Sequence, residues 1–83
     1  IAYNSLRKKV AEALILLNNK YHENNNEEFV IDLSRESLAS IAGTAKESLI
    51  RTLSDFKNEN LIDIKKDGSI TILNQQKLTH LLN

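Results

Sequence analysis

The 83-residue chain contains no cysteine, which excludes disulfide bonds, thiolate-held iron–sulfur clusters and cysteine nucleophiles. No apolar run approaches the roughly 18 residues that a membrane-spanning helix needs, and no signal peptide is visible. We therefore expect no membrane contact and a cytoplasmic location, with which the lack of cysteine is compatible. Methionine is also absent and the chain starts at Ile1, so we expect a piece of a longer protein.

Neither sign of charge is in excess, because 11 basic side chains balance 11 acidic ones. A neutral total argues mildly against a nucleic-acid ligand, for which a basic surface is the usual electrostatic footprint. Four of the 11 acidic residues nevertheless gather in one stretch, at Glu23, Glu27, Glu28 and Asp32. Basic residues follow in the second half, at Lys46, Arg51, Lys57, Lys65 and Lys66. Separated signs can still form a positive face, and we expect weak non-specific binding by an isolated copy.

Residues that carry catalysis or hold metals do not gather in this sequence. His22 and His80 each stand alone, with no neighbours spaced to complete a metal site, so solvation explains them better. No serine, histidine and acid have a helpful spacing, and the adjacent carboxylates of Glu27 and Glu28 would diverge from a loop rather than cooperate. We expect no enzyme activity, no metal ion and no cofactor in this domain.

The first half of the chain predicts a long helix, a polar loop and a short strand. From Asn4 to about Tyr21 apolar residues recur every three or four positions, as in a helix with one buried face, and Arg7 should face solvent. The asparagine-rich segment 22–28 predicts a loop. The alternation of apolar residues over 29–33 predicts a strand.

Two short helices joined at a glycine follow over residues 34–59. Ser34 is the predicted N-cap of the first helix, and Gly43 its end, because glycine adopts the left-handed conformation that terminates helices. Thr44, with Glu47 three positions later, has the pattern of a capping box, so we expect Thr44 to cap the second helix. Helices joined this tightly predict a helix-turn-helix, whose second helix enters the major groove of DNA.

A hairpin and a last helix complete the chain. Two β-prone runs within residues 61–73 flank Asp67 and Gly68, a dipeptide that favours hairpins, and Asn74 can cap a final short helix. A hairpin directly after a helix-turn-helix predicts a wing. We expect one α+β, mainly helical domain over residues 1–83, a winged helix-turn-helix with a small β-hairpin wing. The expected core is Val10, Leu14, Leu17, Leu38, Ile41, Leu49, Leu53, Phe56, Ile62 and Ile72.

Several motifs carry a resemblance to a family of regulators. They are RKKVAEALILL at 7–17, LSRESLASIAG at 33–43, the E-x-x-x-R of Glu47 and Arg51, and NLI with a glycine-centred wing at 60–72. Together they resemble the C-terminal winged helix-turn-helix DNA-binding domain of bacterial transcription regulators related to the cyclic-AMP receptor protein and the fumarate–nitrate reduction regulator, the Crp/Fnr family. The resemblance implies an upstream sensor domain, where any effector would bind, and a dimerisation helix, both before residue 1.

The second helix of the pair, at about 45–58, is the predicted recognition helix. Lys46, Glu47, Ile50 and Arg51 share one face of it. Arginine can bond O6 and N7 of guanine, glutamate can accept from N4 of cytosine, and isoleucine can pack on a thymine methyl group. The resemblance implies that Glu47 and Arg51 read base edges and that Lys46 joins them, although the most familiar member has arginine at position 46 and glycine at position 50. The competing interpretations are a surface salt bridge between Glu47 and Arg51, or a capping role for Glu47.

A second group of residues suits the phosphates of DNA, because hydroxyl groups near helix starts and basic side chains bind anions. These residues are Ser34, Arg35, Thr44, Ser48, Lys65 and Lys66. Plain N-capping and solvation explain the first four equally well. A solvated hairpin tip explains the two lysines almost as well.

The partner that these features predict is double-stranded DNA with a palindromic site. The resemblance implies that the full-length protein binds it as a homodimer, whereas we expect the fragment to be monomeric. In some family members the surface matching the loop 22–28 meets RNA polymerase, and loop solubility explains its composition as well. The alternative function is a winged helix used for protein–protein contacts. That function predicts an apolar reading face, where Ile50 is the lone apolar residue, so the sequence favours DNA.

Overall fold

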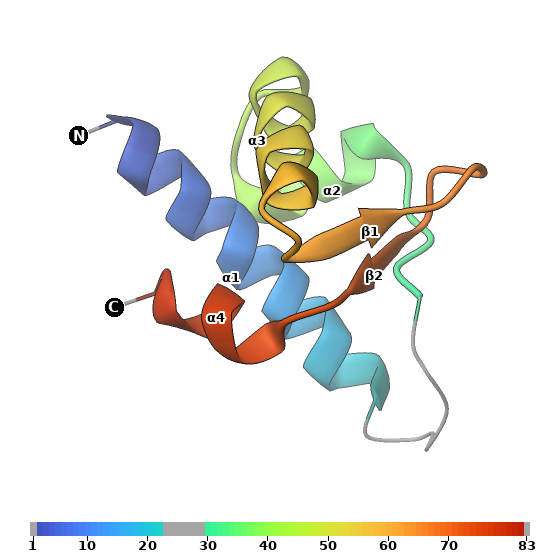
Figure 1. Ribbon diagram of the computed structural model, residues 1–83. Coiled ribbons are helices and arrows are strands. Elements are labelled where there is room, and N and C mark those ends of the chain that lie inside the picture. The colour runs from blue at the N-terminus through green and yellow to red at the C-terminus, as the bar shows by residue number, and fades with distance from the viewer. Residues whose placement is uncertain (1, 23–29, 83) are drawn as a thin grey trace.

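The structure is a computed structural model that describes the backbone of residues 2–22 and 30–82 and the side chains of residues 5–20 and 30–82. Its elements are α1 (Ala2–His22), α2 (Arg35–Ala42), α3 (Lys46–Asn58), β1 (Ile62–Ile64), β2 (Ile70–Ile72) and α4 (Gln75–His80). The helix α1 crosses the molecule and packs against α2 and α3 on one side and α4 on the other (Figure 1). This is the mainly helical α+β architecture, with its hairpin after the helix pair, that the sequence predicts.

One core joins the helices and the hairpin. The buried face of α1 carries apolar residues at the predicted spacing, including Val10 and Leu14, and it meets Leu38 of α2 and Phe56 of α3. Burial of one such side chain contributes about 1.5–3 kcal/mol, so this cluster is the main source of stability. The core predicted from the sequence is buried at every position except two, Ile41 and Ile72.

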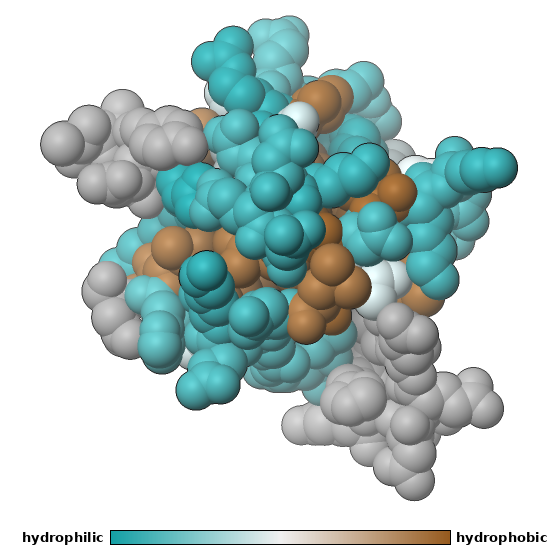
Figure 2. Space-filling model, in the orientation of Figure 1, coloured by the Kyte–Doolittle hydropathy of each residue, from teal (hydrophilic) through white to brown (hydrophobic). Residues whose placement is uncertain are grey.

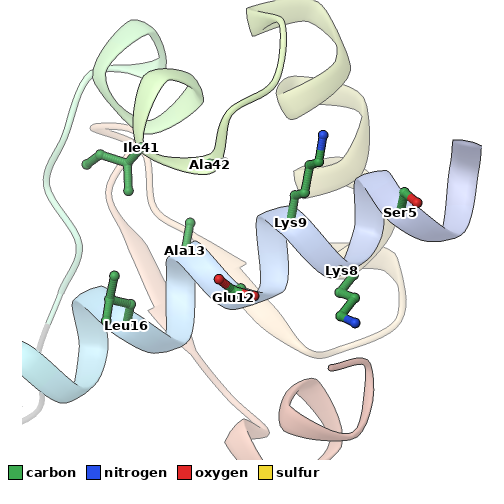
Figure 3. A pocket seen from close by; sticks show the side chains of 8 residues that line it. All are labelled: Ser5, Lys8, Lys9, Glu12, Ala13, Leu16, Ile41 and Ala42. Atoms are coloured by element: carbon green, nitrogen blue, oxygen red, sulfur yellow. The ribbon is translucent and has the colours of Figure 1, made fainter. Parts of the chain in front are cut away.

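Ile41 was wrongly predicted to be a core residue, because its side chain is 47% exposed. Leu38 and Ala39 occupy the buried face of the short helix α2, and Ile41 lies at the edge of that face. There it lines an open groove between α1 and α2, opposite Ala13 and Leu16 (Figure 3). Ile72, at the end of β2, is half-buried against the core.

The wing is an antiparallel hairpin in which Ile62 pairs with Ile72 and Ile64 with Ile70. Alternation along the strands places these isoleucines on one face. The predicted turn forms at Gly68, whose φ is 91° and whose N–H donates to the carbonyl of Lys65 at 2.9 Å. The N–H of Lys65 donates in turn to Ser69 at 2.8 Å, so the turn is a three-residue loop with glycine in the position that needs positive φ.

The predicted strand over residues 29–33 is reduced to a single bridge in the part that the structure describes. Ile31 exchanges two backbone hydrogen bonds with Ile70, at 2.8 and 3.0 Å, and no longer strand is formed there by residues 30–33. Phe29 lies outside the described residues, as do residues 23–28 of the predicted loop. The side chain of Ile31 is buried, so the alternating pattern located a residue that packs on the core but overstated the length of the pairing.

Both helices of the pair end in the same backbone motif. Gly43 has φ 75°, and the N–H of Thr44 donates back to Ala39 at 3.0 Å, which satisfies a carbonyl left free at the end of α2. At the end of α3, Asn60 takes the left-handed conformation with φ 62°, and Leu61 donates back to Phe56 at 3.0 Å. Asparagine tolerates this conformation better than most residues, which gives the NLI motif a structural reason.

Candidate nucleic-acid interface

The two faces of α3 have opposite character. Leu49, Leu53 and Phe56 are buried at the three- and four-residue spacing of a helix and fix α3 on the core. The predicted reading residues, listed together, are all exposed: Lys46, Glu47, Ile50 and Arg51. In Figure 2 the surface over α3 is mainly hydrophilic, with only small apolar areas. The predicted facing of α3 is therefore confirmed.

The start of α3 differs from the prediction. Its N-cap is Ala45, which offers no side-chain hydrogen bond, and the hydroxyl of Thr44 donates to the Ala45 carbonyl at 3.2 Å instead. The capping box was therefore wrong, because the helix begins one residue later than a Thr44 cap requires. Glu47 therefore has no capping-box partner in Thr44. The N–H groups of the first turn of α3 also lack partners within the helix, as at any helix start.

The second competing interpretation, a salt bridge between Glu47 and Arg51, is not formed among the residues that the structure describes. Lys46 does form an ion pair, with Glu36 on α2. The hydrogen bond from Lys46 is the main reason that the pKa of the Glu36 carboxyl lies below its usual range. Of the four predicted reading residues, Lys46 is thus held by a neighbouring helix, whereas Glu47 and Arg51 extend from α3.

The start of α2 is joined to the wing by Arg35. This side chain is half-buried, and its Nη2 donates to the Gly68 carbonyl at 2.8 Å. The bond holds the turn that carries the exposed Lys65 and Lys66 beside α2. Sequence reasoning predicted Arg35 as a phosphate ligand and had no signal for this contact, because α2 and the wing are distant in the sequence.

The wing turn has a further internal restraint. Asp67 Oδ1 accepts from the N–H of Ser69 at 2.9 Å and from its hydroxyl at 2.6 Å. The bond from the Ser69 hydroxyl is the largest cause of the lowered pKa of the Asp67 carboxyl. Together with the Arg35 bond, this restraint fixes the backbone of the wing turn beside α2.

The hydroxyl groups predicted to meet phosphates lie in two places. Ser34 caps α2 as predicted, accepting from the N–H of Ser37 at 3.1 Å. Thr44 and Ser48 line a groove of about 360 Å³ beside the start of α3. Lys9 and Ser5 of α1 line the same groove and were not predicted as site candidates. The helical spacing that predicts α1 could not show which neighbouring helix Lys9 faces.

Arg7 was wrongly predicted to face solvent. Its guanidinium makes two 2.8 Å bonds to the carboxylate of Glu59 and lies 5.0 Å from the centre of the Phe56 ring. The Arg7 side chain is only 14% exposed. The Arg7 guanidinium is the main cause of the lowered pKa of Glu59. This contact joins α1 to the end of α3 and so supports the helix that carries the predicted reading residues.

The described part of the chain contains no group of three or more histidine and acidic residues that could hold a metal ion. Within that same part, no helix is long and apolar enough to cross a membrane.

Asn74 caps α4 as predicted, accepting from the N–H of Lys77 at 3.0 Å. The helix pair, the exposed face of α3 and the attached wing define a winged helix-turn-helix domain.

Comparison with known proteins identifies the family of this chain. Residues 8–81 match the Crp-like helix-turn-helix domain, and the chain belongs to this family of DNA-binding domains of transcription regulators. The predicted resemblance and fold class are therefore confirmed. A search of curated protein sequences found no match.

Three solved structures share this fold. The catabolite activator protein of Thermus thermophilus superposes with a TM-score of 0.82 at 21% identity, over 98% of this chain and 35% of its own. A protein assigned to the crp/fnr family of transcriptional regulators, from Eubacterium rectale, gives 0.74 at 26% identity, over 92% and 32%. Reduced, ligand-free CprK gives 0.71 at 22% identity, over 92% and 37%. The chain thus spans about a third of the length of these proteins.

Proposed function

We propose that this domain binds specific DNA sequences by placing α3 in the major groove. The observation that carries the proposal is the division of α3 into a buried apolar face and an exposed face with free polar groups. Glu47 and Arg51 are exposed, and neither the predicted cap nor a mutual salt bridge engages them among the described residues. Side chains in this state can bond to base edges without first breaking a strong internal contact.

The chemistry of this face suits a short base sequence. Arg51 can donate two bonds to O6 and N7 of guanine, and Glu47, one helical turn before it, can accept from N4 of cytosine. Ile50 is 45% exposed between them and can pack on a thymine methyl group. Lys46 is the fourth candidate reader, at the end of the helix that would enter the groove first.

We also propose six phosphate contacts. Ser34, Arg35, Thr44 and Ser48 lie at or near the starts of α2 and α3, and Lys65 and Lys66 lie on the wing turn. Arg35 keeps further guanidinium donors beside the one that bonds Gly68, so it can serve the wing and a phosphate together. Contacts of this kind would fix the register of the domain on the duplex without carrying sequence information.

The full-length protein is proposed to act as a homodimer on a palindromic site. The similar structures are about three times as long as this chain, and an upstream sensor domain and dimerisation helix would account for that length. Two recognition helices would then lie ~34 Å apart, one turn of DNA. The proposal extends to a cytoplasmic location and to contact with RNA polymerase through residues 22–28, and we expect the isolated chain to be monomeric.

The second candidate function, a winged helix used only for protein contacts, is less well supported. It requires an apolar docking patch on α3, where Ile50 is the one apolar residue of the four exposed readers. Figure 2 shows a surface over α3 that is mainly hydrophilic. Such a surface is better suited to base edges and phosphates than to a hydrophobic interface.

Selection from random duplex DNA followed by NMR mapping tests the proposal. Duplexes bound by the chain are enriched and sequenced, and the enriched duplex is then titrated into labelled protein. We expect a defined half-site and shifts at the backbone amides of Glu47, Ile50, Arg51 and the wing, with α4 unaffected. The matched control is Lys20→Ala, which removes a charge from the far end of α1 and should enrich the same sequence. Enrichment of no sequence, or shifts confined to other surfaces, would contradict the proposal.

A further inference from the structure

The ion pair between Glu36 and Lys46 connects the two helices of the pair across their turn. Glu36 is the second residue of α2, and Lys46 is the first residue of α3. Both side chains are largely open to water, with 65% of Glu36 and 52% of Lys46 exposed. An ion pair this exposed is weak and can be broken by a competing ligand.

The position of Lys46 explains why an acidic neighbour is useful. A cation at the start of a helix is disfavoured by the partial positive charge of the free N–H groups there. The carboxylate of Glu36 offsets this charge and holds the ammonium group toward α2. Lys46 also belongs to the exposed face that we assign to DNA reading, so its ammonium group has two possible partners.

We propose that Glu36 competes with DNA for Lys46 and thereby lowers the affinity of the domain for its sites. This inference rests on the proposed DNA-binding function. In the free protein the Lys46 ammonium group is held by the Glu36 carboxylate, and contact with a guanine or a phosphate requires that this pair be broken. The residue that sets the strength of the Lys46 contact is therefore Glu36, which lies on the other helix and itself reads no base.

Loss of the Glu36 charge would also help DNA binding in a second way that does not involve Lys46. Any carboxylate near the duplex repels phosphates, and this repulsion acts over about 10 Å at 0.1 M salt. The proposal therefore requires that the effect of Glu36 depend on Lys46. A double-mutant cycle separates the two contributions. The direct ion pair is lost when either Glu36 or Lys46 is changed, whereas the repulsion between Glu36 and the phosphates is lost only when Glu36 is changed.

The experiment measures binding of the selected duplex by the parent, Glu36→Gln, Lys46→Met and the double variant at fixed salt. Glu12→Gln is the matched control, because it removes the same charge from an exposed site on α1. Thermal melting checks that each variant is folded. We expect Glu36→Gln to bind about two- to fivefold more tightly than the parent, the range that exposed ion pairs allow. In the Lys46→Met background the same change should shift affinity no more than Glu12→Gln does.

The outcomes separate this inference from the function on which it rests. If the parent binds duplex DNA and Glu36→Gln binds equally or more weakly, the inference is overturned and the proposed function stands. If Glu36→Gln raises the affinity equally in the parent and in the Lys46→Met background, the inference is also overturned, because that result assigns the effect to general repulsion of the phosphates. If the folded parent binds no duplex from the random pool, both the proposed function and this inference are overturned.

Discussion

The two faces of α3 lie on one helix but differ in their exposure to solvent. On the inner face Leu49, Leu53 and Phe56 are 0–1% exposed and serve the core. On the outer face Ile50 is 45% exposed, and Glu47 and Arg51 project to solvent. The inner residues gain free energy from burial, whereas the outer ones contribute little to folding and are free to bind.

Because of this difference, substitutions on the two faces should affect stability and binding separately. Changes on the inner face should unfold the domain and so remove binding indirectly. Changes on the outer face should leave the melting temperature nearly constant, since exposed substitutions usually alter stability by less than about 0.5 kcal/mol. Changes to the contacts at the two ends of α3 should lower stability by an intermediate amount, because these contacts orient the helix without lying at the centre of its buried face.

The largest effect is expected from Leu49→Ala. Leu49 is fully buried, and its truncation removes apolar contacts and leaves a cavity, which costs about 2–5 kcal/mol of unfolding free energy. Ile50→Ala, the adjacent change on the outer face, is the control and should lower stability far less. Urea denaturation of both variants measures the difference. Equal losses of unfolding free energy for the two variants would contradict the division of α3 into a buried face and an exposed face.

Gly43→Val should have the next largest effect, because it changes the join between α2 and α3. The φ of 75° at Gly43 disfavours any β-branched residue, and we expect a loss of about 1–3 kcal/mol together with weaker DNA binding. A β-carbon at this position would meet no atom from another part of the molecule within 4 Å, so the cost comes from the local backbone conformation.

Gly43→Asn serves as the control for that prediction, since asparagine tolerates the left-handed conformation and should lose less. Thermal melting and binding to the selected duplex are measured on both variants. A valine variant as stable as the parent would show that the turn does not depend on this conformation.

A smaller and pH-dependent effect is expected at the end of α3, where Arg7 binds Glu59. The pKa of Glu59 is lowered in the folded protein, so the unfolded chain binds its proton more readily as the pH falls. The contribution of the pair is therefore complete above about pH 4.5, the usual glutamate pKa, and is lost as the pH falls through the lowered value. Because Glu59 is 44% exposed, we expect less than about 1 kcal/mol.

Glu59→Gln isolates this contribution from those of Glu36 and Asp67, whose pKa values are also lowered. The free energy of unfolding is measured for the parent and the variant between pH 3 and pH 7. The parent should be more stable than the variant near neutral pH, and the difference should shrink toward pH 3. A difference that stays constant with pH would mean that the Glu59 charge does not stabilise α3.

Much of the fold could be predicted because local residue choice and helical period agree with the tertiary structure. The period of α1, the positive φ at Gly43, the turn at Gly68 and the cap at Asn74 follow from local chemistry. Ile41 was assigned to the core because it lies three residues after Leu38, and only the packing of α1 against α2 decides which edge of a short helix stays open.

The contacts that could not be predicted join residues distant in the sequence. Arg7 meets Glu59 and Arg35 meets Gly68, and no helical or strand pattern signals either pair. The capping box failed for a local reason, because Thr44 donates back to the end of α2 and the helix starts after Ala45. The exposure of the proposed reading residues was predicted correctly, since it depends on which face of α3 carries the apolar stripe.

We propose that the outer face of α3 reads bases, and binding of Arg51→Ala to a panel of single-base-substituted duplexes is the decisive test. We expect a loss of ~1–3 kcal/mol per half-site on the selected sequence and little further loss on DNA already changed at the base that Arg51 reads. Glu47→Ala should relax preference at a different base pair, and Lys65→Ala should weaken all sequences alike. A uniform loss across the panel for Arg51→Ala would make Arg51 a phosphate contact and contradict the claim.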